Sequence, residues 1–174
     1  MTEDIGATIA AWWRTELRPG EDTPAARALR ARLRRAETGP EVLAQRQVHD
    51  LVAKAPWLRH RPLDLIRLVQ VLARVEGNDP RSLARLLGAG DPPAMSRARF
   101  EALVRSEAAD LPRALRRALP LTDGRCNVAA LARDVLNWDD PERGEKIRQD
   151  WFFEYFNALR MDGAGGVKDT EISQ

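Results

Sequence analysis

Proline and glycine divide this chain into short segments, and within each segment the apolar residues recur at the spacing of an amphipathic helix. Valine, isoleucine and threonine do not alternate with polar residues over any useful length, so strand signals are weak throughout. The pattern predicts an all-α protein, a helical bundle of about eight to nine helices.

Residues that favour helix starts and stops place most of the boundaries. Starts are expected at about Glu3, Thr23-Pro24, Thr38-Gly39-Pro40, Pro62, Asp79-Pro80, Ser96, Asp110, Val128 and Asp140-Pro141. The helix after Pro62 is apolar on most sides, which is typical of a central, buried helix, and Gly77 is expected to close it. Pro56-Trp57 should end the third helix, and residues 121–127 should form a loop.

The length of the chain suits one domain with a core of its own. We expect a single all-helical domain over residues 1–161 and a disordered, glycine-rich tail over residues 162–174. The loop Gly88–Met95 allows an alternative division into two small lobes, 1–88 and 96–161.

Several features favour a cytoplasmic protein. The N-terminus has neither a basic region nor a long apolar run, so no signal peptide is expected, and no stretch is apolar enough for a membrane span. Cys126 is the only cysteine and is expected to be a structural residue.

Arginine supplies nearly all of the positive charge, since lysine occurs only at positions 54, 146 and 168. GC-rich coding would explain the arginine content but not where the arginines lie. In two helices the face opposite the apolar stripe carries arginine without any acid. These arginines are Arg27, Arg30 and Arg34, with Arg35 at the flank, in the second helix, and Arg113, Arg116 and Arg117 in the seventh. In the sixth helix Arg99 and Arg105 lie off the apolar stripe, and Arg97 borders it.

Like charges on one face repel, and a bound anion would relieve that repulsion. The arginine side chain is suited to such an anion because its planar fork binds phosphate oxygens in pairs. We therefore interpret these faces as sites for nucleic-acid backbone. The alternative is that acids on neighbouring helices neutralise the arginines, and the C-terminal third is rich in such acids.

The chain offers little for catalysis, and we expect no enzyme activity, no metal and no cofactor. It has no glycine-rich phosphate loop, dinucleotide fingerprint or metal-spaced cluster of cysteine and histidine. His49 and His60 are expected to be structural or solvent-facing, and Asp139-Asp140 to cap a helix. A helical nuclease with scattered carboxylates stays open as an alternative. Most aromatic residues lie at core positions, so few remain to stack on bases.

An ordered set of segments is similar to a known family. The segments are Trp12 to Leu17, Ala28 to Glu37, Ser82 to Leu87, Arg97 to Arg105, Leu115 to Leu119, Val128 to Trp138 and the aromatic helix at Trp151. In this order the chain resembles the CasB family, the small subunit of the type I-E CRISPR surveillance complex Cascade, over about Ile5 to Ala158.

The resemblance implies an all-helical, non-catalytic subunit that is present as a pair of copies in the complex. Its partners would be the other Cascade subunits, a second copy of itself, CRISPR RNA, and the target and non-target DNA strands, with no membrane. Basic residues would help to hold guide and target and would steady the displaced strand of the R-loop, while a separate nuclease would cut.

Carried over position by position, the family's basic residues fall on Arg34 and Arg35, on Arg97, Arg99 and Arg105, on Arg116 and Arg117, and loosely on Arg61. Near the last helix this chain has Asp139-Asp140-Pro141-Glu142, so only Arg143 and Lys146 match the family's basic pattern there. Two alternatives of other classes remain. One is a helical scaffold that binds acidic partner proteins, and the other is a helix-turn-helix DNA reader built from residues 96–105 and 110–119.

Overall fold

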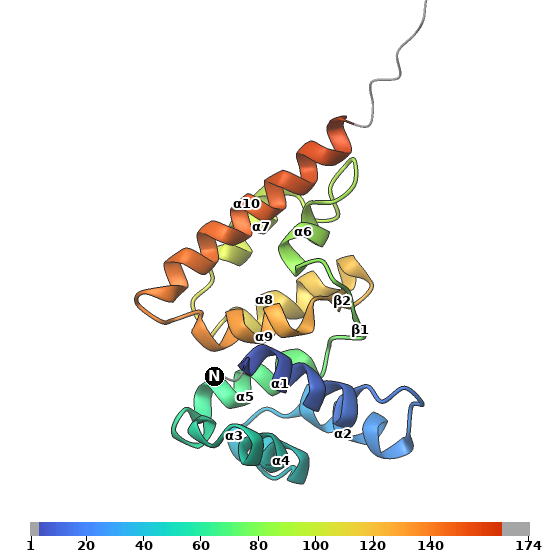
Figure 1. Ribbon diagram of the computed structural model, residues 1–174, viewed down its shortest axis with the longest axis vertical. Helices are drawn as coiled ribbons and strands as arrows, with labels where there is room; N and C mark the ends of the chain where they lie inside the picture. The colour runs from blue at the N-terminus through green and yellow to red at the C-terminus, as the bar shows by residue number, and fades with distance from the viewer. Residues whose placement is uncertain (1–3, 165–174) are drawn as a thin grey trace, which may run out of the picture.

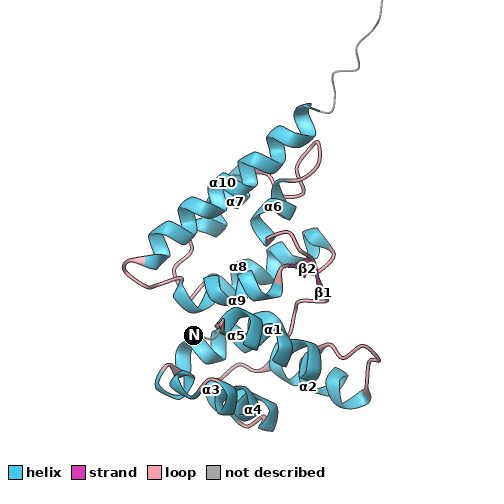
Figure 2. Cartoon of the chain, viewed as in Figure 1, coloured by secondary structure: helices cyan, strands magenta, loops and turns pink. Residues whose placement is uncertain are grey.

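In the computed structural model, residues 4–164 are described, and they form helices joined by short connections, with one very short parallel strand pair (Figures 1 and 2). The α-helices are α1 (Ile5–Trp12), α2 (Pro24–Arg35), α3 (Gly39–Leu43), α4 (Arg46–Lys54), α5 (Pro62–Leu72), α6 (Leu83–Gly88), α7 (Arg97–Val104), α8 (Leu111–Ala118), α9 (Val128–Asn137) and α10 (Arg143–Ala164). Shorter elements are the π-helix η1 (Trp13–Leu17), the 3₁₀ turns η2 (Pro56–His60) and η3 (Leu119–Thr122), and the strands β1 (Gly77–Asn78) and β2 (Arg125–Cys126). The predicted all-α class is confirmed.

Helix α5 lies at the centre of the N-terminal half, as its apolar sequence predicts. Leu65, Leu68, Val69 and Leu72 are buried, and the helix packs against α2, α3, α8 and α9. Figure 1 shows α8 and α9 crossing the middle of the molecule, between α1 and α5 on one side and α6, α7 and α10 on the other. One continuous apolar core therefore joins the two halves of the fold.

The C-terminal half is built on the pairing of α6 with α10. Gly88 allows the close approach, because a Cβ at this position would meet the backbone of Tyr155. The Tyr155 ring stacks on Phe100 with 4.1 Å between centroids, and its hydroxyl donates to the Met95 carbonyl at 2.7 Å. Helix α6 therefore packs with the C-terminal elements of the fold.

Two short chain segments, which contain β1 and β2, join the two halves of the fold beside η3. Strand β1 pairs in parallel with β2, and the Asn78 side chain accepts from the Val128 amide at 3.1 Å. Gly124 turns the chain into β2 with a φ of 70°, a conformation that glycine adopts without steric cost. The Glu76 amide donates to the Gly124 carbonyl at 2.7 Å, so the two segments stay together beyond the strands.

Some of the predicted helix boundaries were wrong. The third helix divides into α3 and α4 at Ala44 and Gln45, and α5 ends at Leu72 rather than near Gly77, which lies in β1. Helix α10 continues to Ala164, so the predicted tail does not begin at Asp162, and residues 165–174 lie outside the described residues. Among the described helices, none is both long and apolar enough to cross a membrane.

Candidate nucleic-acid interface

Helix α8 presents a row of arginines that form no ion pair with the acids of residues 4–164. Its apolar stripe of Leu111, Leu115 and Ala118 is buried, and the helix begins with a proline in its first turn. Arg113, Arg116 and Arg117 are exposed, and within residues 4–164 none of the three forms an ion pair. Among the described residues, neighbouring acids therefore do not neutralise the arginines of this helix.

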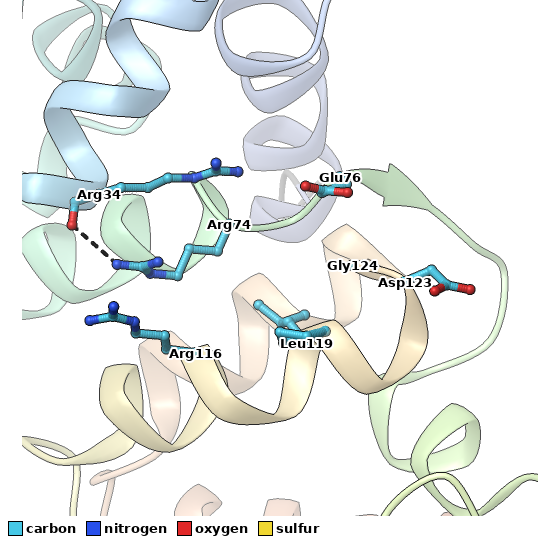
Figure 3. A pocket seen from close by; sticks show the side chains of 8 residues that line it. Arg34, Arg74, Glu76, Arg116, Leu119, Asp123 and Gly124 are labelled. Carbon is cyan, nitrogen blue, oxygen red and sulfur yellow. Dashed lines mark hydrogen bonds between the residues drawn. The ribbon is translucent and has the colours of Figure 1, made fainter.

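Arg116 faces a pocket of about 380 Å³, which we call the α2–α8 pocket (Figure 3). It is lined by Arg34, Arg74, Glu76, Arg116, Leu119, Pro120, Asp123 and Gly124. Three arginines from three elements thus line the pocket: one from α2, one from the residues that follow α5, and one from α8. Burial, followed by the charges of Arg116 and Arg34, lowers the pKa of Arg74. Both causes act in the same direction, because burial and nearby positive charge each disfavour the charged form of an arginine.

Arg74 is the functional candidate that the sequence did not reveal. The sequence pattern placed it inside the apolar helix that Gly77 was expected to close, whereas in the structure it follows the C-terminus of α5. Its guanidinium donates to the Arg34 carbonyl at 3.1 Å, while the Arg34 guanidinium donates to the Ala73 carbonyl at 2.7 Å. Each arginine therefore caps the carbonyl end of the other's helix, which holds both beside the pocket.

Arg113 and Arg117 face a second depression, the α7–α8 groove, of about 440 Å³. Its lining consists of Met95, Arg99, Ala102, Leu103, Ser106, Asp110, Arg113, Ala114 and Arg117. Arg99 from α7 and the two α8 arginines therefore line the same groove. Helix α8 thus contributes arginine to both depressions, and together they form one candidate interface.

The predicted face of α2 is only partly free. Arg30 is buried rather than exposed, which corrects the expectation, and it donates to the Leu17 carbonyl at 2.6 Å and to the Asp22 carboxylate at 2.8 Å. Arg27 is exposed and pairs with Asp22 at 3.4 Å. Asp22 lies in the loop before the helix, outside the neighbouring helices that the sequence suggested as a source of acids. Arg35 stays exposed near Glu41 and Gln45.

Some of the other candidate residues form contacts within the fold, and others are exposed to solvent. Arg61 donates to Asp64 at 2.6 Å and to the Leu136 carbonyl at 2.6 Å, so it is engaged within the fold. Arg97 pairs with Glu101 at 3.0 Å, and Lys146 pairs with Asp150 at 3.0 Å. Two further candidates are exposed: Arg105 at the end of α7, and Arg143, which donates to the Asn137 side chain at 3.2 Å.

Asp139, Asp140 and His49 make contacts within the fold. The Asp140 carboxylate accepts from the amides of Glu142 and Arg143, and these hydrogen bonds lower its pKa, as expected for a capping residue. Asp139 lies 3.9 Å from Arg67, and exposed His49 contacts the Leu43 carbonyl at 2.7 Å. In the described part of the chain no group of three or more acidic, histidine or cysteine side chains is placed to hold a metal.

Comparison with known proteins finds one family. The model of the family CRISPR-associated protein Cse2 matches residues 29–156. A CRISPR-associated protein Cse2 from Thermus thermophilus is 31% identical over 150 residues, which cover 84% of this chain and 87% of that protein. The crystal structure of a Cse2-family protein from the same bacterium aligns with a TM-score of 0.70 and 25% identity, over 88% of this chain and 98% of that chain.

A chain in the crystal structure of Escherichia coli Cascade bound to a PAM-containing dsDNA target has the same fold. It aligns with a TM-score of 0.58 over 89% of this chain and 95% of that chain. Its sequence identity is 21%, so this likeness concerns the fold alone.

Proposed function

This chain belongs to the CRISPR-associated Cse2 family, and we propose that it is a non-catalytic, nucleic-acid-binding subunit of a Cascade complex. Its fold matches a chain of a Cascade complex that is bound to double-stranded DNA. In the proposed role the subunit contacts guide RNA and target DNA and stabilises the displaced strand of the R-loop. Its partners are the other Cascade subunits and a second copy of itself, in the cytoplasm.

The observation that carries this proposal is the row of arginines on α8. Arg113, Arg116 and Arg117 reach two depressions without an ion pair among the described residues, although the chain contains nearly as many acids as bases. Placing like charges together costs free energy, and phosphate groups would relieve it. The aromatic side chains near α7 and α10 stack mainly on one another, which favours contact with backbone rather than with bases.

Modest contacts of this kind are enough to affect target binding. Forming an R-loop exchanges one duplex for another of similar stability, so backbone contacts can tip the balance. Each neutralised phosphate should also add about 0.7 to 0.9 to the slope of log affinity against log salt concentration. A subunit that acts in this way needs no reactive group, and sequence reading is left to the guide.

The test is charge reversal in the assembled complex, with Arg116→Glu and Arg117→Glu combined. We expect weaker binding of target double-stranded DNA and a salt dependence whose slope is shallower by about 1.4 to 1.8, from two lost phosphate contacts. The matched control combines Arg46→Glu and Arg59→Glu, two exposed arginines on α4 and η2. Equal affinity and equal salt slope in both double variants would contradict the proposal.

The alternatives predict different outcomes. A helix-turn-helix reader would bind one DNA sequence by itself, but the connection between α7 and α8 spans residues 105–110, longer than the usual turn of about three to four residues. A scaffold for acidic proteins would assemble with partners yet show no dependence of nucleic-acid binding on Arg116 and Arg117. Purifying the complex and examining it for a bound short RNA separates these outcomes.

A further inference from the structure

Two guanidinium groups lie together at one end of the α2–α8 pocket. Figure 3 shows the side chains of Arg74 and Arg116 pointing to the same side, whereas Glu76 and Asp123 lie at the other end. Glu76 has a cation of its own, because Arg18 lies 3.7 Å from it. No ion pair joins Arg74 or Arg116 to any described acid, so the end of the pocket that they share is purely cationic.

Arg74 is also held in place before any ligand arrives. Its side chain is half-buried and donates one hydrogen bond to the Arg34 carbonyl at 3.1 Å. An arginine has several N–H donors in a fixed planar arrangement, so this bond orients the group and leaves other donors free. The bond between Arg34 and the Ala73 carbonyl fixes the same junction from the other direction.

The α7–α8 groove differs in this respect. Arg99, Arg113 and Arg117 are exposed, and within the described residues no hydrogen bond orients their guanidinium groups. Such side chains can adopt many rotamers, so they supply positive charge without a fixed geometry. A lysine at the same positions would supply the same charge, whereas a lysine at position 74 would lose the planar fork that lets one edge of the group cap a carbonyl while another edge binds phosphate oxygens in a fixed geometry.

We propose that the α2–α8 pocket is a preorganised site for a single phosphate group, gripped by Arg74 and Arg116, with Arg74 as the residue that determines its specificity. The α7–α8 groove supplies only diffuse charge. The inference rests on the proposed function where the phosphate belongs to a nucleic-acid backbone. A free phosphate ion has the same chemistry, and the experiment distinguishes the two sources.

The experiment compares arginine-to-lysine variants, which keep the charge and remove the planar fork. In the complex, Arg74→Lys and Arg116→Lys should each weaken target binding about tenfold, since one paired charge-assisted contact is lost. The control Arg46→Lys should stay within about twofold, because Arg46 is exposed on α4 and lines neither depression. Arg116 makes no hydrogen bond to the described residues through its side chain, so its variant tests the site even if Arg74→Lys destabilises the fold.

A second arm uses the isolated full chain with inorganic phosphate or pyrophosphate, against chloride at equal ionic strength. A rise in Tm that Arg116→Lys abolishes and Arg46→Lys retains would show that free phosphate occupies the pocket. No rise, with lysine-sensitive target binding in the complex, would assign the pocket to nucleic-acid backbone. Equal behaviour of all three lysine variants in both arms would overturn the inference. If the charge-reversal test alone fails, the phosphate arm still reports on the pocket.

Discussion

Arg30 and Arg116 are both arginines, but we expect Arg30 to stabilise the fold and Arg116 to bind nucleic acid. Replacing each with methionine distinguishes the two roles. Arg30 crosses from α2 to the end of η1, where it donates to the Leu17 carbonyl at 2.6 Å in a buried position. That carbonyl belongs to the last turn of a helix and has no partner within the helix. Arg30→Met keeps the apolar length of the side chain but removes every donor, so the carbonyl stays buried without a hydrogen bond.

The cost follows from that single acceptor. A buried acceptor left without its partner costs about 1 to 3 kcal/mol in the free energy of unfolding. For a domain of this size each kcal/mol lowers Tm by roughly 2 to 4 °C, so Arg30→Met should lower Tm by about 2 to 12 °C. Arg27→Met is the matched control, because Arg27 shares the partner Asp22 but is exposed and does not reach Leu17.

The assay is urea unfolding followed by circular dichroism, together with nucleic-acid binding at several salt concentrations. We expect Arg30→Met to lose stability while the slope of log affinity against log salt is unchanged. Arg116→Met should do the reverse, keeping its stability and reducing the slope by about 0.7 to 0.9. The reasoning would be refuted by an Arg30→Met protein that is as stable as the parent and binds nucleic acid as poorly as Arg116→Met.

Three further predictions concern the packing of α10. Burial raises the pKa of Asp134 to about 6 despite the hydrogen bond from Trp151, so the ionised form is disfavoured in the folded protein and stability falls as pH rises from 4 through 6. Asp134→Asn should therefore raise stability by about 1 to 3 kcal/mol at pH 7.5 and leave it unchanged near pH 3, as unfolding in urea at the two pH values would measure. Tyr155→Phe removes the donor to the Met95 carbonyl and should cost about 1 to 2 kcal/mol in urea unfolding. Gly88→Ala brings a Cβ against the Tyr155 backbone and should lower the free energy of unfolding by about 1 to 3 kcal/mol, which would be measured as a lower Tm. An unchanged Tm would mean that α6 and α10 separate easily.

The candidate interface was only partly predictable, and the reason is the length of the arginine side chain. Periodicity correctly placed Arg113, Arg116 and Arg117 on the outer face of α8, because α8 is regular and its buried stripe is apolar. The same reasoning was wrong for Arg30, whose long side chain bends back to a carbonyl in another element. It also missed Arg74, which was expected within the apolar helix closed by Gly77 but lies beyond the end of α5.

The amino-acid sequence by itself determined the fold class, most helix boundaries and the apolar faces, because a helix depends on caps, prolines and a repeat of 3.6 residues that neighbouring positions supply. Tertiary structure alone decided which cations are free. A helix end exposes carbonyl groups, and whichever arginine lies nearest in space caps them. Arg30 and Arg34 do so from α2, and Arg74 does so from beyond α5. Since these partners lie 13 to 40 positions apart in the chain, no local pattern encodes them.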